Sequence, residues 1–165
     1  MALLAERFSA VETSESDRDV TAAFGDFSTD AGIVFNTPVA SRPLAVGRTG
    51  RRSGLTVIAE PECGTAFLAR HIAAALVAHN IVSVSLLQSP TPALSRMLLI
   101  LEDTVPDSFV AITKNGQESW ARVPSGSALA ILTPGAVYFE GREPVVFDPS
   151  LSRLDSRLSL VSTYG

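Results

Sequence analysis

The feature that most constrains the fold is the order of apolar segments between residues 55 and 103. Leu55–Ala59 and Ile81–Leu87 are short β-branched or aliphatic runs, typical of buried strands. Between them, Gly64–His79 is rich in alanine, has no internal Pro or Gly and is followed by Asn80, which favours a helix end. A strand, a helix and a strand with short connections form a βαβ unit, so the two strands are expected to be parallel with a right-handed crossover.

The segments that follow predict further strands. Met97–Leu101 is an apolar run that we interpret as a third strand of the parallel unit. Phe109–Thr113 and Ser119–Val123 flank Asn115-Gly116, the preferred two-residue hairpin turn. Later strand signals lie at Ala128–Leu132, Val137–Glu140 and Val145–Phe147. We therefore predict an α+β fold, in which a parallel βαβ unit (about 55–101) precedes an antiparallel meander (about 109–147) and helices pack on the mixed sheet.

The two end segments have amphipathic spacing. In residues 1–30, apolar side chains are spaced for one face of short helices, at Leu3, Leu4, Phe8, Val20, Ala23, Phe24 and Phe27. This segment is either a helical arm for a partner or a helix folded back on the body. Residues 148–165 predict a closing helix or a tail. Two short strands are expected at Ile33–Phe35 and Leu44–Val46, and no linker divides residues 1–165, so we expect one domain.

The segment from Leu55 to Ala66 resembles the opening of a P-loop NTPase, in which G-x-x-x-x-G-K-[ST] joins a strand to a helix. In the overlay, the second glycine of the motif falls on Gly64, the lysine on Thr65 and the hydroxyl residue on Ala66. The lysine that contacts the phosphates and the hydroxyl that binds Mg²⁺ are therefore absent. The resemblance implies shared βαβ architecture or a degenerate nucleotide-binding protein, with Gly64 and Thr65 as the candidate ligand-binding residues.

Four acidic residues follow the predicted parallel strands in two pairs. Glu60 and Glu62 stand where a polyphosphate would lie and would repel it, whereas Glu102 and Asp103 follow a run that resembles a Walker B strand. Because parallel sheets form their crevice at the carboxyl ends of the strands, we expect the two pairs to lie together. They are candidate ligands for a divalent cation, or for a basic peptide, and they define a third hypothesis, a small enzyme with an acidic pocket.

Cys63 and the two histidines do not form a catalytic or zinc constellation. Cys63 precedes a helix, where the helix dipole would favour a thiolate, but His71 lies roughly 12 Å farther along the same helix and out of reach. Glu60 and Glu62 are expected to raise the pKa of the thiol. His71 and His79 are eight positions apart with no further histidine, so we expect no paired zinc site.

One loop concentrates positive charge. Arg48, Arg51 and Arg52 lie in a glycine-bounded segment, Gly47–Gly54, whose guanidinium groups and accessible amides suit a phosphate or a carboxylate. A solvated hairpin loop is the alternative interpretation. Nucleic acid is expected to bind, if at all, only through this loop.

Composition restricts the remaining classes of function. The net charge is −4 and charged residues make up 18%, below the roughly 25% of an average protein, so no global field attracts nucleic acid or anionic membrane. The start of the chain predicts no secretory leader, and no apolar run reaches the ~20 residues of a membrane span. We expect a soluble cytoplasmic protein, or a virion component if the source is viral, with no cofactor.

The low charge density, the preference for Arg over Lys and the missing reactive groups favour a non-catalytic protein. We expect a protein-interaction or structural-assembly role, as a homo-oligomer or within a larger complex.

Overall fold

The computed structural model describes residues 1–36, 54–112, 126–147 and 153–165. The predicted strands at Leu44–Val46 and Ser119–Val123, and the turn at Asn115-Gly116, lie outside the described residues.

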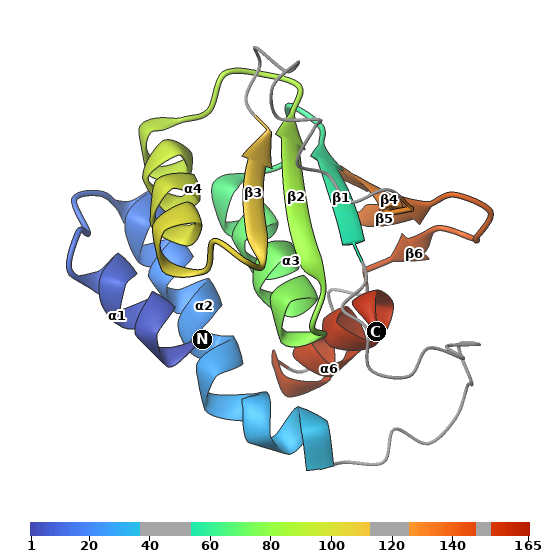
Figure 1. The fold of residues 1–165 in the computed structure, drawn as a ribbon, viewed down its shortest axis with the longest axis horizontal. Coiled ribbons are helices and arrows are strands. Elements are labelled where there is room, and N and C mark those ends of the chain that lie inside the picture. The colour runs from blue at the N-terminus through green and yellow to red at the C-terminus, as the bar shows by residue number, and fades with distance from the viewer. Residues whose placement is uncertain (37–53, 113–125, 148–152) are drawn as a thin grey trace.

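A six-stranded mixed sheet organises the molecule, with strand order β3-β2-β1-β4-β5-β6 (Figure 1). The first four strands along the chain are parallel, because β1 pairs in parallel with both β2 and β4, and β2 does so with β3. The last two strands continue the sheet in antiparallel pairs. The strands are β1 (Gly54–Ala59), β2 (Ile81–Leu86), β3 (Phe109–Ile112), β4 (Ala128–Thr133), β5 (Ala136–Phe139) and β6 (Val145–Val146). The predicted mixed sheet, with a parallel unit followed by antiparallel strands, is confirmed.

Five helices are present among the described residues. They are α1 (Ala2–Ser9), α2 (Glu15–Asn36), α3 (Thr65–Val77), α4 (Pro92–Thr104) and α6 (Arg153–Tyr164). In Figure 1, α3 lies behind the parallel strands, α4 lies beside β3, α1 and α2 form the left side of the molecule, and α6 lies below the sheet. Within the described part of the chain, no helix is both long and apolar enough to cross a membrane.

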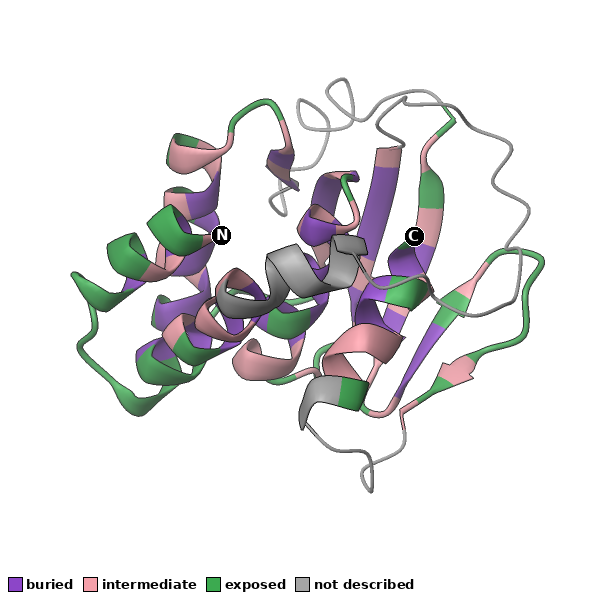
Figure 2. Cartoon of the chain, turned by 90° about the horizontal axis from the view of Figure 1, so that it is seen from below, coloured by how far each residue is buried: buried purple, intermediate pink, exposed green. Residues whose placement is uncertain are grey.

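The main core lies between α3 and one face of the sheet. Alternate residues of the central strands, such as Val57, Val84 and Leu132, are buried on this inner face and meet Ile72 of α3. Figure 2 shows that buried residues recur along the strands and along the helices that pack on the sheet. Full burial of a side chain of this size contributes about 1.5–3 kcal/mol to folding. The small side chains of α3 at Ala73 and its neighbours leave space for α2 to pack on the other side of the helix.

The two N-terminal helices pack on this body through the apolar residues that the sequence indicated. Phe8 of α1 and Phe24 of α2 are buried, and their ring centroids are 4.7 Å apart. The start of α2 is fixed by Asp17, whose carboxylate accepts hydrogen bonds from the side chains of Thr13 and Ser14. Arg96 of α4 donates to both oxygens of the same carboxylate at 2.6–3.0 Å. This bidentate pair lowers the pKa of Asp17 below its usual range and joins α2 to α4.

The prediction of a strand at Met97–Leu101 is wrong, because these residues lie in α4. Thr91 caps the helix by accepting a hydrogen bond from Leu94 N at 3.2 Å, and Pro92 occupies its first turn. The buried side chains include Leu94, Met97, Leu98 and Leu101. Their spacing of three and four residues is helical, and it outweighs the apolar character of the run.

Three other predicted strands differ from the structure. Ala128–Leu132 was expected to lie inside the antiparallel meander, whereas β4 pairs in parallel with β1 and in antiparallel with β5. Ile33–Phe35 lies in α2, which continues to Asn36 because no proline interrupts the chain before Pro38. Phe109–Thr113 was expected to begin the antiparallel meander. It forms β3 instead, which pairs in parallel with β2 and belongs to the parallel part of the sheet. With 97–101 helical, the connection from β2 to β3 is a second crossover, which brings the next strand in parallel.

Candidate functional site

The carboxyl edge of the parallel strands is the first candidate site. The segments that follow β1, β2 and β4 meet at this edge, at the top of the sheet in Figure 1. The chain leaves β1 to build strands on one side, β2 and β3, and returns to place β4 on the other. Open α/β sheets bind ligands where the strand order reverses in this way. The reversal falls between β1 and β4, and residues 60–65 follow β1 at that point.

Hydrogen bonds fix the segment after β1 against the end of β4. Glu60 N donates to Leu132 O at 3.1 Å, and Cys63 Sγ lies 3.3 Å from the same carbonyl oxygen. Burial raises the pKa of the Cys63 thiol, and the nearby carboxylates of Glu60 and Glu62 raise it further. The expected effect of the two acids on the thiol is therefore confirmed, and Cys63 is held in the protonated, weakly nucleophilic form.

The first turns of α3 and α4 also meet at this edge. Gly64 is the N-cap of α3 and provides no side-chain cap, whereas Thr91 caps α4. The hydroxyl groups of Thr65 and Thr91 are 3.3 Å apart, which places the beginnings of the two helices side by side. Helix N-termini favour anions, but Glu60 and Glu62 introduce negative charge next to them. The candidate ligand-binding residues Gly64 and Thr65 are thus at the switch point, in mixed electrostatic surroundings.

The structure does not bring the two acidic pairs together. Glu60 and Glu62 follow β1 at the carboxyl edge, whereas Glu102 and Asp103 end α4, which runs back to the opposite edge (Figure 1). Glu102 accepts a hydrogen bond from Ala111 N of β3 at 3.0 Å, and Asp103 forms an ion pair with Arg7. Within the described ranges, no three His, Cys, Asp or Glu side chains are grouped to hold a metal ion. The remaining candidates, Arg48, Arg51 and Arg52, lie outside the described residues.

A buried polar pair was not indicated by the sequence. His71 Nδ1 and the Tyr164 hydroxyl group are joined by a hydrogen bond of 2.5 Å, although the residues are 93 positions apart. His71 is 1% exposed. The only available sequence signal was its place next to Ile72, on a helix that is apolar around most of its circumference. That position indicated a core histidine but did not identify its partner.

The second candidate site is the outer face of the sheet at its β5–β6 end. Ile131 pairs with Tyr138, and Ala136 pairs with Val146, so these side chains share the face opposite to the core. We call these four residues the outer strip; within it Ala136 is buried and Ile131 is half-buried. Tyr138 is 44% exposed and Val146 is 73% exposed.

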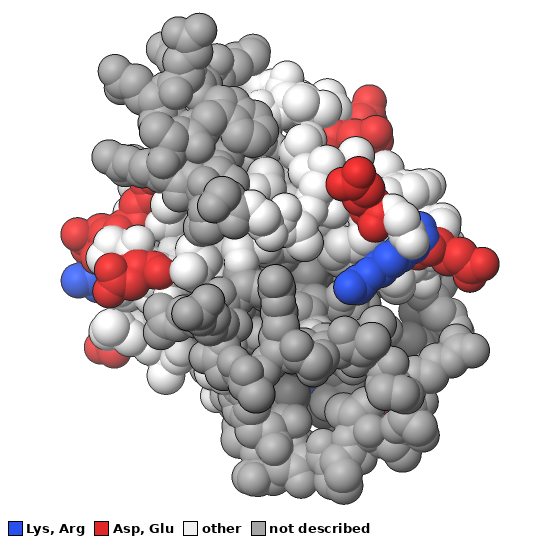
Figure 3. Space-filling view, turned by 45° about the vertical axis from the view of Figure 1, so that its right-hand side comes forward, with Lys and Arg blue, Asp and Glu red and all other residues white. Residues whose placement is uncertain are grey.

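A charged turn lies beside the outer strip. The turn between β5 and β6 contains Glu140, Arg142 and Glu143. The Arg142 guanidinium carbon lies 5.5 Å from the centroid of the Phe139 ring, and Phe139 pairs with Ala130 on the core face, so this contact is on the side away from the outer strip. Figure 3, which turns this end toward the viewer, shows acidic side chains and a basic side chain grouped on the right-hand side of the molecule. An apolar strip with a charged border is the usual anatomy of a protein interface.

The two edges of the sheet differ in protection. At β3, the backbone N–H of Ala111 donates a hydrogen bond to the Glu102 carboxylate, and α4 lies alongside the strand. At β6, Phe147 N donates to Gly135 O at 2.9 Å, so the N–H of Val146 points away from β5. Pro144 has no N–H and shortens this free edge. The accessible feature at this end is therefore the face formed by the outer strip, more than the strand edge.

Comparison with protein-family models, with curated proteins and with solved structures finds no match to this chain.

Proposed function

We propose that the protein acts by binding other protein chains through the outer strip, as a homo-oligomer or as a component of a larger assembly. The observation that carries this proposal is the exposure of Tyr138 and Val146, diagonal neighbours on adjacent strands of one sheet face, next to a charged turn. Isolated exposed apolar residues are normal on protein surfaces, whereas apolar residues that adjoin on one rigid face favour association. A sheet face holds such residues in fixed positions, which lowers the entropy cost of binding.

The surrounding residues support association in preference to chemistry. Cys63 has a raised pKa, and His71 is enclosed in the core, so neither is presented as a reactive group. The charged turn from Glu140 to Glu143 can select a partner by charge without contributing much affinity. Tyr, the residue type of Tyr138, is among those most enriched at the energetic centres of interfaces.

Val146→Glu should weaken association at least tenfold while leaving the fold intact. A carboxylate in the contact must be desolvated when the surfaces meet, whereas at an exposed position it changes the free energy of unfolding by only about 0.5 kcal/mol. Analytical ultracentrifugation of the purified protein, and pull-down from its native source, would measure the association.

Leu99→Glu is the matched control. Leu99 is 65% exposed on α4, away from the outer strip, so the same charge should leave association unchanged. Equal weakening by both substitutions would indicate a general effect of charge, and no weakening by Val146→Glu would exclude the outer strip.

A second candidate, a degenerate nucleotide-binding or regulatory protein, is favoured by one observation. The β1–α3 segment opens at the switch point between β1 and β4, where α/β sheets place nucleotides. This is an argument from fold, and fold does not establish function.

Binding of ATP or GTP should raise the melting temperature if this second candidate is correct. Gly64→Glu should abolish the shift, because it adds negative charge at the start of α3. Gly64 has φ −64° and open space around its Cβ position, so the backbone tolerates a side chain there. Gly64→Ala controls for loss of the glycine itself. No shift at millimolar nucleotide would exclude this function.

A further inference from the structure

His71 occupies a closed aromatic environment beneath α6. Its ring centroid lies 4.4 Å from that of Phe67, 4.8 Å from that of Phe147 and 5.7 Å from that of Tyr164. The imidazole thus has three rings around it and a single described hydrogen bond, to the Tyr164 hydroxyl group. Among the residues that the structure describes, the groups in contact with the ring are aromatic or hydroxyl groups, and none is a carboxylate.

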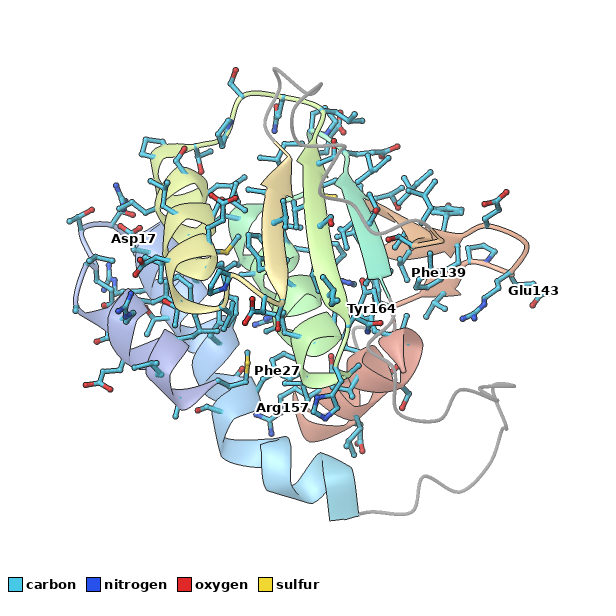
Figure 4. All side chains as sticks on the ribbon, viewed as in Figure 1. Asp17, Phe27, Phe139, Glu143, Arg157 and Tyr164 are labelled. Carbon is cyan, nitrogen blue, oxygen red and sulfur yellow. The ribbon has the colours of Figure 1, made fainter. Side chains whose placement is uncertain are left out.

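Tyr164 is the residue through which α6 closes this environment. Its hydroxyl group binds His71, and its carbonyl oxygen accepts a hydrogen bond from Asn80 Nδ2 at 2.9 Å. Its ring also contacts Phe139 of β5, with centroids 5.9 Å apart; both residues are labelled in Figure 4. Leu160 and Val161 complete the buried face of α6, which packs on α3 and on the edge of α2.

We propose that α6 is an acid-sensitive latch, held on α3 only while His71 is uncharged and released as a unit when His71 gains a proton. The interface of α6 is small beside the core of the sheet, so its opening costs less free energy than global unfolding. Opening exposes the imidazole to water, where it can be protonated. Closing then requires the proton to leave.

The direction of the pH effect follows from burial. Desolvation lowers the pKa of His71 from 6.5 to about 3 in the closed state. With α6 released and the ring hydrated, the pKa returns toward 6.5. The closed state is therefore fully favoured above pH 6.5, and it loses stability progressively as the pH falls from 6.5 toward 3. Most of the mildly acidic range lies inside this window.

The surrounding elements carry further charged groups. Arg70 of α3 is exposed, and so is His79, which follows the end of that helix. On α6, Arg157 lies 3.9 Å from Asp26 of α2, while Asp155 is exposed. Burial raises the pKa of Tyr164, so its hydroxyl group stays protonated throughout the window. The turn between β5 and β6, which lies between Phe139 and Phe147 in the sequence, carries Glu140, Arg142 and Glu143, and all three are exposed.

Hydrogen exchange of the whole protein, corrected for intrinsic rates, tests this latch. Between pH 7.5 and pH 5, the opening equilibrium of α6 should increase about 30-fold, as linkage to a group of open-state pKa 6.5 requires. Amides of β1 and β2 should not follow this increase. Tyr164→Phe should lower the protection of α6 at every pH and keep the same dependence on pH, because His71 is still buried.

His71→Gln and His71→Phe should abolish the pH dependence between 7.5 and 5, and either variant suffices if the other does not fold. Glutamine keeps a polar partner for the Tyr164 hydroxyl group, and phenylalanine keeps the ring volume. Persistence of the 30-fold change in either variant would overturn the proposal. So would equal loss of protection in α6 and in the central strands, since that result would indicate global unfolding.

Discussion

Phe24→Ala should lower the free energy of unfolding by about 3–5 kcal/mol, the largest effect expected for a single substitution outside the sheet. Phe24 is 0% exposed and packs against Phe8, so truncation removes apolar contacts and leaves a cavity between the N-terminal helices and the body. Denaturant unfolding followed by circular dichroism would measure the change.

The same experiment decides between the two interpretations of residues 1–30. Leu3→Ala is the matched control, because Leu3 is 57% exposed on α1 and its truncation should change stability by no more than about 0.5 kcal/mol. If residues 1–30 were an arm that binds only a partner, Phe24→Ala would be as mild as Leu3→Ala. That outcome would contradict the packing described above.

Asn80→Ala should cost about 2–4 kcal/mol, because it removes two buried hydrogen bonds at once. The side-chain nitrogen of Asn80 donates to Ala75 O at 3.1 Å and to Tyr164 O at 2.9 Å. The first bond closes the end of α3, and the second attaches α6. Tyr164 O would lose this donor at a cost of about 1–3 kcal/mol, whereas Ala75 O keeps the backbone N–H of Asn80 at 3.1 Å and loses only about 1 kcal/mol. Thermal and urea unfolding would report the loss.

Gln88→Ala provides the comparison for Asn80. Gln88 also donates from a side-chain amide to a backbone carbonyl, Pro61 O at 2.6 Å, but this bond is exposed. Water can replace it, so the expected change is within about 0.5 kcal/mol. Equal effects of the two substitutions would contradict the role assigned to Asn80 in joining α3 and α6.

The central part of the fold could be predicted because local pattern and tertiary structure agree there. Leu55–Ala59 and Ile81–Leu87 are apolar runs of strand length, and an uninterrupted alanine-rich helix lies between them. Steric preference then makes the two strands parallel. The end of α3 was also indicated by Asn80, although its role as a cap that binds Tyr164 depends on a helix distant in the sequence.

The error at Met97–Leu101 shows why apolar character alone was insufficient. A short apolar run fits a strand or a buried helix equally well, and the decisive signals were Thr91 and Pro92 at its start. The error also affected the predicted site. A strand would have placed Glu102 and Asp103 beside Glu60, whereas a helix carries them to the opposite edge of the sheet.

The position of Gly64 and Thr65 at the carboxyl edge followed from the sequence, because the end of a strand determines it. Contacts between distant segments did not follow. The bond between His71 and Tyr164, and the adjoining exposure of Tyr138 and Val146, depend on register and helix docking, which no local pattern in one sequence specifies.

The most direct test of the proposed function is the mass of the wild-type protein in solution, measured by light scattering over a micromolar concentration series and on material isolated from its native source. We predict a mass at least twice that of the 17.4 kDa chain, or a complex with a second protein, and Val146→Glu should reduce it to that of one chain. A mass of one chain at every concentration, with no partner in the native material, would contradict the proposal.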